Sequence, residues 1–295
     1  MKKVSAIITT HNRERLLKRA VESVLSQSYP NIEVIVVDDH SCDGTKDYCA
    51  SVPDINYVYI PPEESKGGNY ARNKGISAVT GEYIAFLDDD DYWLPTKIEK
   101  QVELIERTKC ELVYCGYLKE VVTKDNVKFS EVYPLLENRG DMSTRILMTI
   151  PTTTSNILVT TNALKEVSFF DESLLFWQEY ELLIRLSKIT TFDFVNEVLA
   201  VYRIDMTDSS RLSNKYDSWK RAVEYIYLKH KDRYSRLNTI EKFYARALVW
   251  NDARKRCKAS GMKTLWLMYT AMAFPVRAVR RLQRIIGFST KNRFK

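Results

Sequence analysis

Four consecutive aspartates, Asp88 to Asp91, directly follow the apolar segment Tyr83–Leu87. Adjacent carboxylates repel one another and favour water, so their position after a segment that looks buried needs an explanation. In one interpretation they form a solvated turn and cap the helix predicted in "LPTKIEKQVELIE". In the other they hold Mg²⁺ or Mn²⁺, which takes a few carboxylate oxygens and shares the rest of its shell with substrate phosphates.

Two other polar groups also follow strand-like segments. Thr9 to Asn12 stand at the end of Val4–Thr10, and Asp38 and Asp39 follow Glu33–Val37. Parallel α/β sheets bind their ligands at the carboxyl ends of strands, so all these groups are expected at one edge. This shared position favours the metal site over the solvated turn. The sequence has no G-x-G-x-x-G after the first strand and no G-x-x-x-x-G-K-[ST], which argues against a dinucleotide site and a P-loop.

The elements that must position these residues alternate between strand and helix patterns. Four apolar runs are predicted to be strands: Val4–Thr10, Glu33–Val37, Tyr57–Ile60 and Tyr83–Leu87. The clearest helical pattern has its apolar residues on one face: Leu16, Leu17, Ala20, Val21, Val24 and Leu25. Near-continuous apolar strands between amphipathic helices predict an α/β protein with a mostly parallel sheet covered on both faces.

The composition is that of a folded soluble protein, with 45% apolar and 28% charged residues in a chain of 295. This length allows one large domain or two small ones. No signal peptide is visible, and the longest apolar run, Leu265–Phe274, is shorter than the roughly 20 residues that span a bilayer. The five cysteines lack metal-site spacing. Reduced thiols and a cytoplasmic location are therefore expected.

Four segments follow one another along the chain: "VSAIITTHNR", "IEVIVVDDHSCDGT", "NYARNKGISAVTGEYIAFLDDDDYWLP" and "FFDESLLFWQEYELLIRLS". Together they resemble the inverting, family 2 glycosyltransferases with a GT-A fold. The resemblance covers about residues 1–205. It implies a Rossmann-like domain with a nucleotide-sugar-binding half, 1–105, and an acceptor half, 106–205. Residues 206–295 resemble nothing specific and look helical.

The resemblance implies donor-binding roles for five residues: Thr9, Asp39, Arg72, Asp88 and Asp89. Asp39 would accept a hydrogen bond from a uracil-like ring, and Asp89 would reach the ribose. Asp88 and Asp90 match the D-x-D motif of the family, which implies that they hold Mn²⁺ or Mg²⁺ against the donor diphosphate. The family often has "DSDD" or "DADD" where this chain has "DDDD". Which of the four aspartates takes which role is therefore left open. Asp91 is a candidate cap of the next helix.

An inverting transfer also needs a base for the acceptor hydroxyl. Glu179 lies six residues before Arg185, at the spacing of the catalytic aspartate in the family's "EDxDLxLRL" pattern. This chain departs from the pattern, with Glu for Asp and Gln178 for Glu. Glu181 is therefore a rival for the base. The alternative role for Glu179 is an N-terminal cap of the following helix.

The resemblance implies transfer of a sugar, most often from a UDP donor, to a glycan or lipid-linked hydroxyl in surface polysaccharide synthesis. A nucleotidyltransferase of similar fold is a second hypothesis, but "TTHNRERL" lacks the glycine-rich loop that it would need. A non-catalytic binding or scaffold protein is a third. Its basic tail has few aromatics beyond Phe288 and Phe294 for stacking on nucleic acid bases.

The basic charge is concentrated at the carboxyl end. Residues 253–295 contain 12 Lys or Arg and no acidic residue, whereas residues 1–252 have 33 basic and 38 acidic residues. Pro275 is expected to end one helix. The next predicted helix, 276–288, has an apolar and an arginine face: Val279, Leu282, Ile285 and Ile286 against Arg277, Arg280, Arg281 and Arg284. This pattern favours peripheral binding to the inner face of an anionic membrane; the alternative is packing on the protein or in a homodimer.

Overall fold

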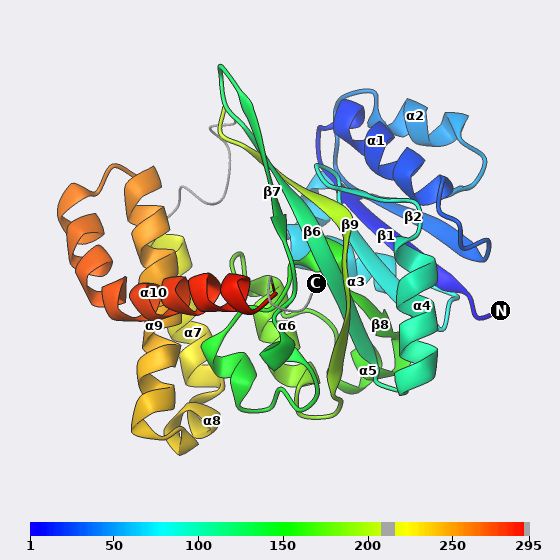
Figure 1. Cartoon of the computed structure of the whole chain (residues 1–295). Coiled ribbons are helices and arrows are strands. Elements are labelled where there is room, and N and C mark those ends of the chain that lie inside the picture. Colours follow the sequence, from blue (N-terminus) through cyan, green and yellow to red (C-terminus); the bar gives the residue numbers. More distant parts are fainter. Residues whose placement is uncertain (208–215, 292–295) are drawn as a thin grey trace. The chain divides into compact units, whose positions relative to one another are not determined.

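The computed structural model describes residues 1–207 and 216–291, and their side chains up to residue 278. The chain divides into two compact units. The first comprises Met1–Ile146 and Ile150–Ser209, and the second comprises Leu147–Thr149 and Ser210–Lys295. Figure 1 shows the α/β character of the first unit and the helical character of the second.

Nine strands of the described residues form one sheet in the first unit, in the order β3-β2-β1-β4-β8-β6-β9-β5 with β7 paired to β6. Their bounds are β1 Val4–Thr10, β2 Ile32–Asp39, β3 Ile55–Ile60, β4 Tyr83–Asp88, β5 Tyr92–Trp93, β6 Leu112–Val122, β7 Val127–Val132, β8 Leu158–Thr160 and β9 Phe192–Asp205. The strands β3, β2, β1 and β4 are parallel, β8 is antiparallel to its neighbours, and β6 is parallel to β9. The mostly parallel α/β sheet predicted from the sequence is therefore confirmed.

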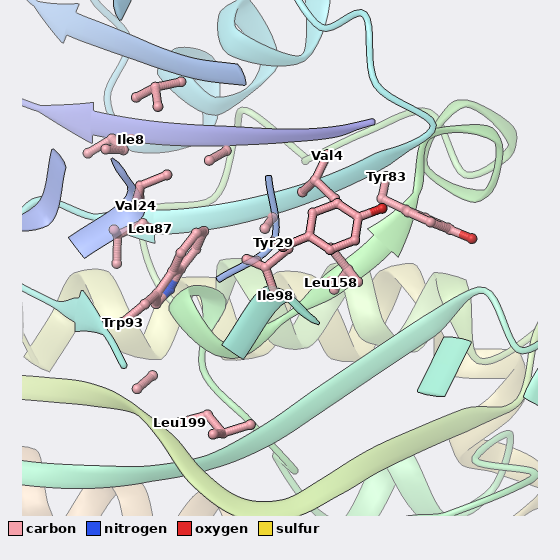
Figure 2. Packing of buried hydrophobic residues seen from close by; sticks show 14 of the residues in the cluster. Val4, Ile8, Val24, Tyr29, Tyr83, Leu87, Trp93, Ile98, Leu158 and Leu199 are labelled. Atoms are coloured by element: carbon pink, nitrogen blue, oxygen red, sulfur yellow. The ribbon is translucent and has the colours of Figure 1, made fainter. Parts of the chain in front are cut away.

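The main core lies on one face of this sheet. Alternate side chains of β1, Val4 and Ile8 among them, point to this face and pack with Leu87 of β4. Helices α1 (Glu14–Leu25) and α4 (Lys97–Thr108) supply buried side chains such as Val24 and Ile98 to the same cluster. Figure 2 shows these residues together. This packing sets the position of the strand ends, because the helices and the central strands share one close-packed interior.

Helix α3 (Gly68–Ser77) packs against the other face. Gly75 lies so close to the sheet that an added Cβ would meet Ile7 Cγ2 at 2.6 Å and Val37 Cγ2 at 3.0 Å. A larger side chain at this position would push α3 outwards. The glycine therefore lets α3 approach the sheet closely, with Arg72 one turn earlier on the same helix.

The remaining helices of the first unit are α2 (Thr45–Ser51), α5 (Thr161–Glu166) and α6 (Gln178–Leu186). The second unit contains α7 (Tyr216–Lys229), α8 (Lys231–Arg236), α9 (Thr239–Ala259) and α10 (Lys263–Lys291).

Helix α9 begins with a capping box, in which Asn238 and Glu241 each accept a backbone N–H of the other. Within the described residues, none of the helices has the length and apolar character to cross a membrane.

Pro275 does not end a helix, and the sequence-based prediction of a break there was wrong. It lies inside α10, which continues to Lys291. A proline removes only one backbone hydrogen bond, and a helix can absorb its ring by bending. Ala273 and Val276 on either side are buried in the second unit, and their packing supports the helix through this position. The amphipathic faces predicted from Val279 to Ile286 lie outside the described side chains.

Candidate active site

The ends of the central strands bring the predicted polar groups to one edge of the sheet. Asp88, the last residue of β4, pairs in register with Thr9 of β1. Thr10 of β1 pairs with Asp38 of β2 on its other side. The shared edge that the strand order predicts is therefore present, with Thr9, Asp38, Asp39 and the aspartate cluster Asp88–Asp91 along it.

The aspartate cluster forms a tight turn that one serine holds. The backbone N–H of Asp91 donates to the carbonyl of Asp88 at 3.0 Å. Ser155, in the short 3₁₀ helix Thr154–Asn156, accepts the N–H of Asp88 at 3.2 Å and donates to the Asp91 carboxylate at 2.5 Å. The Asp91 carboxylate also accepts the N–H of Arg203 at 2.9 Å. These bonds fasten the turn to the later part of the sheet.

Asp91 therefore does not cap the next helix, which corrects the prediction. The residue at the N-cap of α4 is Thr96, and the two-residue strand β5 separates it from Asp91. The side chain of Asp91 is buried and its oxygens are taken by Ser155 and Arg203. Burial raises the pKa of Asp91, and the charges of Asp90 and Asp88 raise it further.

Asp89 and Asp90, in the middle of the cluster, lie next to Arg13, the N-cap residue of α1. Arg13 donates to Asp89 at 3.1 Å and lies 3.5 Å from a carboxylate oxygen of Asp90. Asp89 also accepts the hydroxyl of Thr10 at 2.9 Å. Burial, together with the neighbouring Asp88 and Asp89 charges, raises the pKa of Asp90 to about 7, against the opposing effect of Arg13. Asp90 is thus a half-buried carboxylate under electrostatic repulsion.

The end of β2 carries two aspartates in different environments. Asp38 is fully buried and accepts the hydroxyl of Tyr57 at 2.6 Å and the N–H of Ser41 at 2.9 Å. Asp39 is half-buried, and its carboxylate lies 3.2 Å from His40 Nδ1. The hydrogen bonds of Asp38 are those of a structural residue. Asp39 retains access to the edge where a nucleoside could bind.

Arg72 connects two parts of the chain. It is almost buried, and its Nη2 donates to Asp88 Oδ1 at 2.6 Å. Its Nη1 donates to Gln178 Oε1 at 2.8 Å and to Asn69 Oδ1 at 3.3 Å. Arg72 is therefore not a surface arginine: it joins the aspartate cluster to the first residue of α6.

The two candidate bases, Glu179 and Glu181, both lie in the first turn of α6. The N-cap of this helix is Trp177, so Glu179 is inside the helix and does not cap it. Glu181 is buried and bound to Arg185, whereas Glu179 is half-buried. A base that must meet an acceptor needs access, and Glu179 has more of it.

Asp88 and Asp90 are the residues that could bind a divalent cation. Within residues 1–207 and 216–291, no three His, Cys, Asp or Glu side chains are arranged to hold a metal ion. Asp88 and Asp90 nevertheless offer two half-buried carboxylates. Burial and the charges of Asp88 and Asp89 raise the pKa of Asp90, and a bound cation would offset both effects. Two carboxylates suit Mg²⁺ or Mn²⁺ when the rest of the shell comes from substrate phosphates and water.

Sequence reasoning missed three residues of this region. Arg13 directly follows "TTHN", and its charge beside the strand end was a usable signal for pairing with the aspartates. Ser155 lies in the irregular segment "TTTSN", where nothing in the pattern points to the cluster. Gln178 was noted only as a departure from a family pattern, although its amide binds Arg72.

The sequence matches one family model and several curated proteins. The family model described as "Glycosyl transferase family 2" matches residues 5–170. An uncharacterized glycosyltransferase of Rickettsia typhi is 33% identical over 207 residues, which are 68% of this chain and 64% of that protein. The Escherichia coli "UDP-Glc:alpha-D-GlcNAc-diphosphoundecaprenol beta-1,3-glucosyltransferase WfaP" is 42% identical over 120 residues, 41% of this chain and 48% of the relative. The chain thus spans less than two thirds of either relative.

Two solved structures share the fold. Staphylococcus aureus TarS 1–349 in complex with UDP-GlcNAc has a TM-score of 0.58 at 16% identity, covering 94% of this chain and 92% of that one. The mannosyltransferase PcManGT of Pyrobaculum calidifontis, in complex with GDP-Man and Mn²⁺, has a TM-score of 0.59 at 15% identity and covers 96% and 80%. At this identity the likeness concerns the fold alone.

Proposed function

Because the chain belongs to glycosyl transferase family 2 and has the GT-A fold, we propose that it is an inverting glycosyltransferase. The observation that carries the proposal is the position of Arg72 between Asp88 and Gln178. This arginine joins a carboxylate cluster suited to a donor and its metal to the helix that carries Glu179. Fold alone would not support an activity, since unrelated functions share folds.

We propose a UDP-linked sugar as the donor. The name of WfaP specifies UDP-Glc, and this sequence relative supports UDP. The two solved structures contain different nucleotides, UDP-GlcNAc in TarS and GDP-Man in PcManGT, and do not choose between them. Thr9 and Asp39 would contact the nucleoside from the ends of β1 and β2, and Asp89 the ribose. Asp88 would bind at the diphosphate side with Arg72. The residues 1–105 thus form the donor half of the domain.

Asp88 and Asp90 would hold a Mn²⁺ or Mg²⁺ ion in this proposal. The chemistry that such an ion supplies when bound is neutralisation of the charge that develops on the leaving diphosphate. The Mn²⁺ bound by PcManGT and the repulsion around Asp90 support this assignment.

Glu179 acts as the general base. Its carboxylate takes the proton of the acceptor hydroxyl as the oxygen attacks the anomeric carbon. The bond from that carbon to the diphosphate oxygen breaks on the opposite face, so the product has the inverted configuration and the nucleoside diphosphate leaves. The burial of Glu181 in an ion pair supports Glu179 for this role.

The acceptor in our proposal is a hydroxyl of a glycan or a lipid-linked sugar of a surface polysaccharide. The name of WfaP, which specifies a sugar on diphosphoundecaprenol, supports a lipid-linked acceptor. Residues 106–205 would form the acceptor half. The basic segment 253–295 would bring the enzyme to the membrane that carries such a lipid.

A thermal-shift screen followed by a transfer assay tests the function. UDP and UDP-sugars with Mn²⁺ should raise the melting temperature, and the best donor should be consumed with a sugar linked to a long-chain alkyl diphosphate. NMR of the product should show the inverted anomeric configuration. Stabilisation by nucleoside triphosphates with release of pyrophosphate would indicate a nucleotidyltransferase instead. A protein that responds to no nucleotide would be a binding or scaffold protein.

A further inference from the structure

Helix α3 braces the segment that leads into α6. Asn69 is buried and donates to the carbonyls of Asp171 at 2.7 Å and Leu174 at 3.2 Å. One turn later, Asn73 donates to the carbonyl of Phe170 at 2.9 Å and accepts its N–H at 3.0 Å. Both contacts are made with backbone atoms, so they hold the path of the segment whatever its side chains are.

The last contact of this brace is made by a side chain of α6 itself. Gln178 accepts from Arg72 at 2.8 Å and uses its own N–H to bind the carbonyl of Leu174 at 3.1 Å. Arg72 in turn binds Asp88. A continuous chain of hydrogen bonds therefore runs from the aspartate cluster through Arg72 to the residue before Glu179.

We propose that Gln178 is a positioning residue that couples the donor side of the site to the base. Through Arg72 it ties the first turn of α6 to Asp88, so the helix that carries Glu179 is held in register with the bound donor. The inference rests on the proposed glycosyl transfer, in which Glu179 is the base.

The neutrality of Gln178 is part of this proposal. The Arg72 side chain is only 7% exposed, and Asp88 is the carboxylate that it pairs with at 2.6 Å. Gln178 and Asn69 accept its other hydrogen bonds without a charge. A glutamate at 178 would compete with Asp88 for the same guanidinium, because buried opposite charges attract strongly. Gln178 thus positions α6 while leaving the charge of Arg72 to Asp88 and the donor.

Two substitutions separate these roles. Gln178→Ala removes the contact, so kcat should fall about 10-fold while the stabilisation by UDP with Mn²⁺ stays that of the wild type. Gln178→Glu keeps an acceptor for Arg72, so kcat should return to within about 2-fold, but KM for the donor should rise. Glu172→Gln is the matched control. Glu172 is exposed and lies in the same segment, but its carboxylate accepts from Asn73 at 2.9 Å and not from Arg72.

Hydrogen exchange tests the coupling without a sugar acceptor. Addition of UDP with Mn²⁺ should slow exchange of the amides in the first turn of α6 in the wild type and in Glu172→Gln, and not in Gln178→Ala. Transfer by Gln178→Ala at the wild-type rate would overturn the proposal. So would parallel losses of kcat, UDP stabilisation and melting temperature, which indicate a merely structural residue. If the wild type transfers no sugar, the proposed function fails and the exchange result alone decides whether Gln178 couples the two sides.

Discussion

Arg185 surrounds the carboxylate of Glu181, one turn earlier on α6. Its Nε lies 3.1 and 2.9 Å from the two carboxylate oxygens, and its Nη2 donates at 2.8 Å. The remaining Nη1 donates to the carbonyl of Val167 at the end of α5. The pair therefore fastens α6 to α5, and the oxygens of Glu181 are already used.

This geometry separates the two candidate bases by experiment. Glu179→Gln should lower kcat by about 100-fold or more, the usual scale for a lost general base, and leave the melting temperature and donor binding unchanged. Glu181→Gln should instead lower the free energy of unfolding by about 3 kcal/mol, because it breaks a buried ion pair. The transfer rates of the two variants should be measured well below both melting temperatures, so that both proteins are folded during the assay. Full activity of Glu179→Gln with a crippled Glu181→Gln would move the base two residues along the helix.

The repulsion around Asp90 predicts opposite effects with and without metal. Asp90→Asn should raise the melting temperature of the metal-free protein at pH 8, because burial and the Asp88 and Asp89 charges raise the pKa of Asp90 to about 7. A group with a raised acidic pKa destabilises the fold once it is ionised, and an amide removes that cost. The same variant should lose the additional stabilisation that Mn²⁺ gives to UDP binding.

The control for this experiment is Asp54→Asn, an exposed aspartate before the amino end of β3. It makes the same charge change and should behave as the wild type in both conditions. At a ligand concentration about 100 times Kd the wild type should gain about 2.7 kcal/mol. Equal stabilisation by UDP in Mn²⁺ and in EDTA would contradict a metal at Asp90.

The sequence predicted the four parallel strands β1 to β4 because the signals there are local, and it did not predict β5 to β9. The apolar run of β1 was predicted with its observed bounds, and the Tyr83–Leu87 run ended one residue before β4 does. The prediction of a helix break at Pro275 was wrong because tertiary packing decides the structure there. Local chemistry predicts a break, but Ala273 and Val276 are buried by tertiary packing, and that packing decides.

The candidate site could be predicted only as a region. Parallel strand order sufficed to bring Thr9 and Asp88 together. The contact of Arg72 with Gln178 joins residues 106 positions apart, and that of Ser155 with Asp91 joins residues 64 apart. Neither pair is related by a helix or strand period, so no pattern in the sequence points to the bond.

Lys97 predicts how stability varies with alkaline pH. Its ammonium group is fully buried on the first residue of α4, lies 4.1 Å from the centre of the Trp93 ring and donates to Gln101 at 2.8 Å. Burial lowers the pKa of Lys97 to about 8, from 10.5. The unfolded chain therefore binds more protons between these two values, so wild-type stability should gain from this residue as pH rises from 8 to 10.5.

Lys97→Met removes the buried charge at similar length, and it should be more stable than the wild type at pH 7 by about 1–3 kcal/mol. The difference should shrink towards pH 10, where Lys97 is largely neutral in the fold. Urea unfolding of both proteins at the two pH values measures it. A difference that stays constant with pH would show that the ammonium is not desolvated as the structure indicates.

Exposed apolar side chains on α10 guide the membrane experiment. Leu267 and Phe274 are 60% and 65% exposed, whereas Ala273 and Val276 are buried in the second unit. A truncation must therefore leave Val276 in place, or it would disturb the fold. A chain that ends at Ala278 removes the predicted stripe and six of the 12 basic residues of the segment 253–295.

We expect the intact chain to co-sediment with vesicles that contain phosphatidylglycerol, and less at high salt, because each arginine near an anionic surface contributes about 1 kcal/mol. The chain ending at Ala278 should bind at least 10-fold more weakly. A full-length variant with Arg280→Gln, Arg281→Gln and Arg284→Gln separates charge from the apolar stripe, and it should lose the preference for phosphatidylglycerol over phosphatidylcholine.

If truncation left binding unchanged, the exposed face around Leu267 would be the contact. If no form bound vesicles, the segment would be a docking or dimer element, which sedimentation equilibrium would detect.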